Sequence, residues 1–214
     1  MHMMVEWAVY VKIFTALLVI VNPLSAVPVF VSLTGSMSER ERKRIARTTS
    51  VAVAVVLITA TLIGESLLSL FGISISSFKV GGGILLMLMA IAMMQARQTR
   101  TKQTPEEAEE AEDKQSIAVV PIAIPLLAGP GAISTVIIYA NTAYNPAHIA
   151  LIIFIVLLVA MVTWVALYVA NPVSKMLGKT GINIATRLMG LLLTAVAVEF
   201  IASGLVQLLP GLAK

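Results

Sequence analysis

Two short clusters of proline, glycine and polar residues interrupt otherwise apolar stretches of the sequence. They are Asn22-Pro23-Leu-Ser25 and Gly129-Pro130-Gly131-Ala-Ile-Ser134. Proline removes a backbone donor and collides with the preceding helical turn, and glycine releases the chain from helical dihedral angles. Each cluster therefore predicts an interrupted helix with unpaired backbone groups. Free amides at a helix start attract anions and free carbonyls suit an ammonium group, so the pattern predicts a site for a small zwitterionic solute.

Simpler interpretations of these clusters remain open. The prolines could only kink two helices for packing. The hydroxyls of Ser25 and Ser134 could contact the solute, but a serine in a membrane helix more often bonds its own backbone.

Glu199 is the third candidate, within the apolar sequence Val-Ala-Val-Glu199-Phe-Ile-Ala. A carboxylate deep in a bilayer costs about 2.5 kcal/mol or more, so we expect this side chain to face the bundle interior and to serve in proton coupling. The alternative is a neutral carboxyl bonded to a neighbouring helix. We expect Glu65, near the end of its helix, to be interfacial, and His148, at a helix start, to be solvated.

The sequence gives little support to enzymatic, metal-binding or nucleic-acid-binding functions. The chain has no cysteine and two histidines, and it contains neither an HExxH nor a GxSG pattern. The sequence therefore predicts no enzyme, no cofactor and no metal site. The net charge is +4, but the basic residues lie between apolar runs rather than on one face, which argues against a nucleic-acid partner.

The elements that position these residues are predicted to be membrane helices. Of the 214 residues, 58% are hydrophobic and 12% are charged, and a soluble domain needs more charge to cover its surface. Crossing the hydrocarbon core takes roughly 20 apolar residues. Six stretches qualify: Ile13–Leu33, Arg47–Leu70, Lys79–Ala96, Ile117–Ala140, Ala147–Ala170 and Arg187–Leu209. Both proline clusters then fall near the midplane.

Charge predicts the orientation. Five Lys and Arg residues lie in Thr34–Arg47, four in Arg97–Ser116 and three in Asn171–Arg187, whereas the alternate connections carry almost none. By the positive-inside rule the basic connections are cytoplasmic and both termini lie on the outer side. Ser38 and Glu41 have capping-box spacing, which predicts that the second helix starts at Ser38.

The two halves of the chain resemble each other. Asn22-Pro23 corresponds to Gly129-Pro130, Glu65-x6-Gly72 to Asn171-x6-Gly178, and Lys79-Val-Gly-Gly82 to Arg187-Leu-Met-Gly190. We therefore predict an all-α membrane protein of two inverted three-helix repeats, with the first and fourth helices broken near the midplane. The repeats span residues 1–96 and 117–214 and are joined by a flexible cytoplasmic linker, 97–116.

Four segments carry a family resemblance: NPLSAVPVF, FGISISSFKVGGGILL, PIAIPLLAGPGAIS and RLMGLLLTAVAVEFI. Together they resemble the MarC family of bacterial inner-membrane proteins. The resemblance implies a LysE-like secondary transporter or exporter of small neutral amino acids.

Two functions thus compete at this stage. The first is alternating-access transport of a small neutral amino acid, with Asn22, Pro23, Ser25, Gly129, Pro130, Gly131 and Ser134 binding the solute. The second is a membrane scaffold or assembly protein that transports nothing, in which the interruptions are structural.

Overall fold

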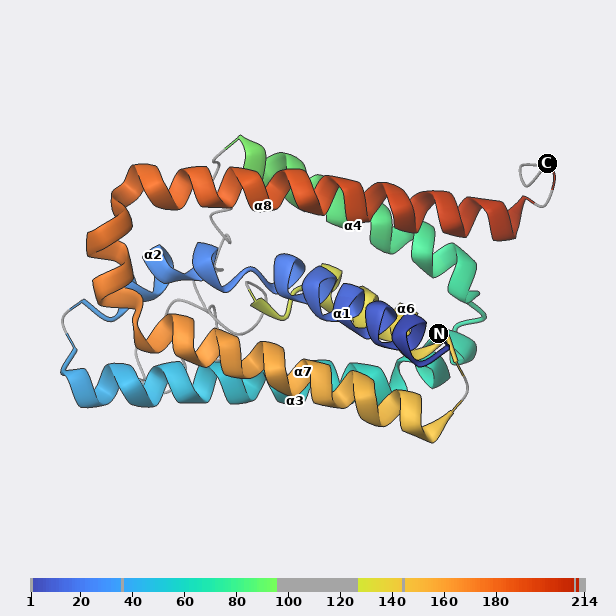
Figure 1. Cartoon of the computed structure of the whole chain (residues 1–214), viewed down its shortest axis with the longest axis horizontal. Coiled ribbons are helices and arrows are strands. Elements are labelled where there is room, and N and C mark those ends of the chain that lie inside the picture. Colours follow the sequence, from blue (N-terminus) through green and yellow to red (C-terminus); the bar gives the residue numbers. More distant parts are fainter. Residues whose placement is uncertain (1, 36, 96–126, 144, 210, 212–214) are drawn as a thin grey trace.

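The chain folds into α-helices throughout the part that the computed structural model describes, residues 2–35, 37–95, 127–143, 145–209 and 211. These residues contain seven helices and no strand, which confirms the all-α prediction (Figure 1). The helices are α1 (His2–Val21), α2 (Pro23–Leu33), α3 (Glu39–Leu70), α4 (Ile75–Met94), α6 (Pro130–Ala140), α7 (Pro146–Tyr168) and α8 (Ala170–Leu208).

Five helical segments in these described ranges are long and apolar enough to cross a membrane, against six predicted. They are Trp7–Leu33, Glu39–Leu70, Ile75–Met94, Pro146–Tyr168 and Thr180–Leu208. The predicted fourth span is represented by α6, which has 11 residues and is too short to cross a bilayer alone. The first part of that span, 117–126, and the predicted linker, 97–116, lie outside the described residues.

Local chemistry fixes most helix boundaries. At the start of α3 the Ser38 hydroxyl accepts from the Glu41 amide, and the Glu41 carboxylate accepts from the Ser38 amide at 2.9 Å. This confirms the predicted capping box. Asn145 caps α7 by accepting from the amide of Ala147 at 3.0 Å. Helix α8 is bent at Gly178, whose φ of 59° suits glycine because a side chain there would be strained.

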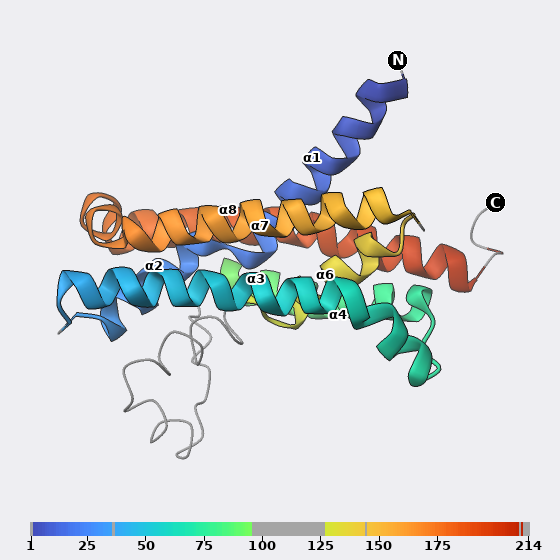
Figure 2. The same cartoon turned by 90° about the horizontal axis from the view of Figure 1, so that it is seen from below.

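The long helices form two antiparallel pairs with the short helices between them (Figure 1). Helix α3 packs on α7 and α4 packs on α8. Helix α2 packs on α7 and α8, whereas α6 packs on α3 and α4, so each short helix contacts the long helices of the other half of the chain. Helix α1 is steeply inclined to the long helices (Figure 2).

Equivalent elements recur at an almost constant separation along the chain. Helices α2 and α6 both have 11 residues and begin with a proline, Pro23 and Pro130, 107 residues apart. Helices α3 and α7 begin at Glu39 and Pro146, again 107 residues apart. The only glycines with positive φ among the described residues are Gly72 and Gly178.

The contacts between α4 and α8 also repeat at this separation along the chain. A Cβ atom on Gly83 would lie 2.9 Å from the Ala197 carbonyl oxygen, and one on Gly190 would lie 3.0 Å from the Ala90 carbonyl oxygen. Residue 83 corresponds to 190, and 90 to 197, at a separation of 107. The sequence comparison paired Gly82 with Gly190, one residue out of this register.

The outer surface of the bundle is apolar. Large hydrophobic side chains such as Leu88, Met161 and Leu191 are about 60% exposed, at 59%, 59% and 60%. Such a surface is stable only against lipid or another apolar partner. The described chain is thus a multi-pass membrane bundle.

Candidate functional site

Asn22 separates α1 from α2, at the position of the first proline cluster. Asn22 adopts a left-handed conformation, with φ 45° and ψ 67°, and is 5% exposed. Its amide donates to the Leu18 carbonyl at 2.9 Å, which closes α1. The next residue, Pro23, has no amide hydrogen, so the Val19 carbonyl cannot receive its usual helical bond. Helix α2 starts without a side-chain cap, so its first amides are not satisfied by a capping side chain.

Further along α2, Pro28 lies inside the helix and likewise cannot donate to the Leu24 carbonyl. Pro23 and Pro28 therefore each remove one helical donor, from the last turn of α1 and from the first turns of α2. The Asn22 carbonyl accepts from the Ser25 amide at 3.1 Å.

The second interruption is the start of α6. Gly129 is extended, with φ −70° and ψ 175°, and the helix again begins with a proline and no side-chain cap. Gly129 and Gly131 are buried, whereas Pro130 is exposed. A Cβ on Gly131 would lie 2.7 Å from Leu86 Cδ2, so glycine permits α6 to approach α4 here.

Helix α4 brings the two interruptions together. The side-chain nitrogen Nδ2 of Asn22 lies 3.9 Å from the sulfur of Met93. The added Cβ of Gly131 would lie 3.1 Å from the sulfur of Met89, one turn earlier on the same helix, and 3.6 Å from Ile20 of α1. Asn22 and Gly131, from opposite halves of the chain, therefore lie against successive turns of α4. The methionines between them are flexible, polarizable side chains that adapt to a neighbour's shape.

The two candidate serines bond their own helices. The Ser25 hydroxyl donates to the Asn22 carbonyl at 2.9 Å, and the Ser134 hydroxyl donates to the Pro130 carbonyl at 2.7 Å. In this structure both hydroxyl protons are therefore used locally, as the simpler interpretation predicted.

Glu199 does not face the bundle interior, and that prediction was wrong. Its side chain is exposed, whereas the next residue, Phe200, is 5% exposed and packs edge-on against Tyr139 of α6, with ring centroids 5.7 Å apart. Consecutive residues of a helix point about 100° apart, so burying Phe200 turns Glu199 outward.

His148 corrects a second prediction, because it is 6% exposed rather than solvated. Its Nε2 lies 2.8 Å from the Tyr139 carbonyl and 3.1 Å from the Thr142 hydroxyl, and its Nδ1 lies 3.0 Å from the Tyr10 hydroxyl. Since a carbonyl only accepts, Nε2 carries the hydrogen and Nδ1 accepts from Tyr10. His148 thus ties α1 to α6 and α7, a contact that no local sequence signal indicated.

Two hollows of about 400 Å³ each lie at opposite ends of the bundle. The Lys43 hollow is lined by Phe30, Glu39, Arg42, Lys43, Leu167, Tyr168, Val169, Asn171 and Pro172. The Glu65 hollow is lined by Thr61, Leu62, Glu65, Ser66, Ala140, Asn141, Ala143, Asn145, Pro146 and Ile149.

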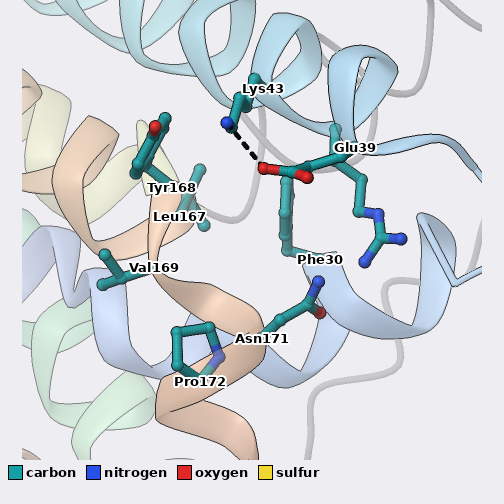
Figure 3. Close-up of a pocket in the computed structure, with 9 residues that line it drawn as sticks. Phe30, Glu39, Lys43, Leu167, Tyr168, Val169, Asn171 and Pro172 are labelled. Carbon is teal, nitrogen blue, oxygen red and sulfur yellow. Dashed lines mark ion pairs between the residues drawn. The ribbon is translucent and has the colours of Figure 1, made fainter.

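In the Lys43 hollow the Lys43 amine lies 2.7 Å from Glu39 and over the Tyr168 ring, 5.1 Å from its centroid (Figure 3). Arg42 uses its Nε to donate to the Met37 carbonyl at 3.1 Å. The lining is therefore net positive.

The two hollows use corresponding positions of the two halves. Thr61, Leu62, Glu65 and Ser66 in one match Leu167, Tyr168, Asn171 and Pro172 in the other, each 106 residues later. The charges do not match, because the described residues that line the Glu65 hollow include one carboxylate and no basic side chain.

Within the described ranges no three His, Cys, Asp or Glu side chains come together as metal ligands would.

Comparison with known proteins gives a full-length match. The family model described as "MarC family integral membrane protein" matches residues 7–209. The chain is 38% identical over 207 residues to the UPF0056 membrane protein YhcE of Escherichia coli, covering 97% of this chain and 96% of that protein. A UPF0056 membrane protein of Methanocaldococcus jannaschii is 39% identical over 196 residues, covering 92% and 95%. No solved structure gives a significant match.

Proposed function

The chain belongs to the MarC family of integral membrane proteins, and from this premise we propose that it is a secondary transporter of small neutral amino acids. It would carry a zwitterion of glycine or alanine size by alternating access, either inward or outward. The observation that carries the proposal is the meeting of the two helix interruptions, Asn22 and Gly129–Gly131, on one face of α4.

The chemistry of that meeting point fits a zwitterion. The uncapped starts of α2 and α6 offer backbone amides with partial positive charge to a carboxylate. The carbonyls of Val19 and Leu24, which lose their helical donors to Pro23 and Pro28, offer acceptors to an ammonium group. Unpaired backbone in hydrocarbon costs several kcal/mol per group, so such interruptions persist where protein or a polar solute satisfies them.

Alternating access needs two halves that exchange roles, and we propose that the chain is an inverted repeat of three helices. The equal lengths and 107-residue separation of α2 and α6 support it. So do the reciprocal contacts of Gly83 with Ala197 and of Gly190 with Ala90. Because each repeat has an odd number of spans, the second repeat enters the membrane from the side opposite to the first.

We place the protein in a bacterial plasma membrane with both termini outside. The start of α1 and the end of α8 lie at one end of the bundle, and the α2–α3 connection and the α8 bend lie at the other (Figure 1). Five basic residues lie from Arg40 to Arg47, at the start of α3. That end is cytoplasmic if the positive-inside rule holds here.

Proton coupling through Glu199 is a separable part of the proposal. Glu199 precedes Phe200, whose ring packs against Tyr139 of α6, so a change in the charge of Glu199 would reach the helix that begins at Pro130. The coupling would pass through α6 rather than through direct contact with the solute.

The test is uptake of radiolabelled glycine and alanine into proteoliposomes that contain the purified protein, with and without an imposed pH gradient. We expect saturable uptake that Asn22→Ala weakens. Glu199→Gln should flatten the pH dependence while leaving uptake measurable; an unchanged pH profile removes Glu199 from coupling. Absence of uptake or exchange for every small neutral amino acid would refute transport and favour the scaffold alternative.

A further inference from the structure

The Glu65 hollow contains a surplus of hydrogen-bond acceptors. The Asn141 side chain donates its amide hydrogen to the Ile137 carbonyl at 2.9 Å, while its Oδ1 is buried and has no hydrogen-bond partner. It is the one such buried side-chain atom in the described part of the chain. The reversed amide would set Oδ1 against the Ile137 carbonyl, acceptor to acceptor, so the orientation is fixed by its neighbour.

Glu65 adds a negative charge to the same hollow. It lies in the last two turns of α3, and the described residues give it no ion pair. The crossing of α3 and α6 holds it near Asn141, because Gly64 packs directly against Ile137, one turn before Asn141. The carboxylate and the orphan amide oxygen thus flank one helix crossing.

The remaining polar side chains of the described lining carry no charge. The Thr61 hydroxyl donates to its own helix at the Leu57 carbonyl, 2.7 Å away, and Asn145 Oδ1 is used in capping α7. Among the described residues, no lysine, arginine or histidine lines the hollow. The ligand that complements Glu65 and the Asn141 Oδ1 best is therefore one that carries positive charge and donates hydrogen bonds.

We propose that the Glu65 hollow binds a small primary ammonium ion, with Glu65 as the counter-charge and the Asn141 Oδ1 as a hydrogen-bond acceptor. In a transporter this is the first contact for the amine end of an arriving or departing amino acid, and that role rests on the proposed function. Binding of the ammonium group itself does not. The hollow is some distance along the bundle from the interruptions at Asn22 and Gly131, so it is a separate site.

The corresponding hollow at the other end explains why this site would exist at one end only. There the position of Glu65 is taken by Asn171, and Lys43 and Arg42 make the lining net positive. An ammonium ion would be repelled from that hollow. The two ends therefore differ in charge although their shapes correspond.

The experiment titrates the protein in lipid nanodiscs with methylammonium chloride and follows the thermal midpoint by tryptophan fluorescence. A ligand that binds the folded state raises the midpoint according to its concentration relative to Kd. Tetramethylammonium chloride has the same charge without N–H donors, and sodium chloride controls for ionic strength. Glu39→Gln, which removes one carboxylate at the other end of the same helix, is the matched control for Glu65→Gln.

We expect methylammonium to raise the wild-type midpoint more than either control salt. Glu65→Gln should weaken the apparent Kd by about ten-fold or more, as loss of a charge-assisted hydrogen bond predicts, and Asn141→Ala by less. Glu39→Gln should behave as wild type. Equal responses of Glu65→Gln and Glu39→Gln, or equal effects of all three salts, overturn the proposal.

Transport assays separate the two proposals. If the proteoliposomes move no amino acid but the Glu65-dependent methylammonium response persists, the site stands and the transport function fails. If amino acids are transported with methylammonium binding unchanged in Glu65→Gln, the site fails and transport stands.

Discussion

The crossing of α4 and α8 allows a prediction to be worked out from distances. At Gly83 an added Cβ would lie 2.9 Å from the Ala197 carbonyl oxygen and 3.0 Å from the Ile201 amide nitrogen. Both are backbone atoms, so they cannot rotate away as a side chain would. Ordinary contact begins at about 3.4 Å, so Gly83→Ala must push the two helices apart by a few tenths of an ångström.

Separating the two helices weakens their packing and so lowers the free energy of unfolding. Overpacking a tight interface by one methyl group costs about 1–3 kcal/mol. Gly190→Ala should cost a similar amount, because its Cβ would lie 3.0 Å from the Ala90 carbonyl oxygen in the equivalent contact. The double variant should cost less than the sum, because the first methyl group already separates the helices.

The assay is unfolding by SDS in mixed micelles, followed by far-ultraviolet circular dichroism, which gives the free energy of unfolding. Gly81→Ala is the control, since it makes the same change two residues away, where nothing lies within 4 Å of the added atom. We expect that variant to stay within about 0.5 kcal/mol of wild type. Equal stability of Gly83→Ala and Gly81→Ala would show that α4 and α8 do not approach this closely. The contacts of Gly83 with Ala197 and of Gly190 with Ala90 would then no longer support a repeat.

Three further predictions concern the buried His148, the helix residue Ser25 and the exposed pair of Lys43 with Glu39. His148→Leu removes two hydrogen bonds of the imidazole, to the Tyr139 carbonyl and to the Tyr10 hydroxyl, so it should lower the free energy of unfolding by about 1–3 kcal/mol, and Tyr10→Phe by about 0.5–1.5 kcal/mol; equal stability of His148→Leu and wild type in the SDS titration would contradict the network. Ser25→Ala should change the KM for uptake by less than about two-fold, since its hydroxyl bonds its own helix; a ten-fold rise would show that the hydroxyl turns to the solute. Lys43→Gln breaks an exposed pair with Glu39, so its SDS midpoint should equal that of wild type at both low and high salt, and a salt-dependent loss would mean that the pair is shielded from water.

The sequence alone determined the features that depend on local chemistry. The length of the apolar stretches predicts helices that can cross a membrane, and five of the six predicted spans have such a helix close to the expected bounds. Ser38 and Glu41 predicted the start of α3 because a capping box involves only four consecutive residues. Pro23 and Pro130 predicted where α2 and α6 begin, because a residue without an amide hydrogen fits the first turn of a helix and not its interior.

Only the tertiary structure decided which way each helix faces. In a soluble protein a polar stripe marks the outer face, but a helix between lipid and an apolar interior is hydrophobic on both sides, so its sequence does not encode its rotation. For that reason Glu199 was predicted inside and is exposed, and His148 was predicted to be solvated and is buried. The meeting of Asn22 with Gly131 on α4, and the orphan oxygen of Asn141 beside Glu65, likewise depend on contacts between helices far apart in the chain.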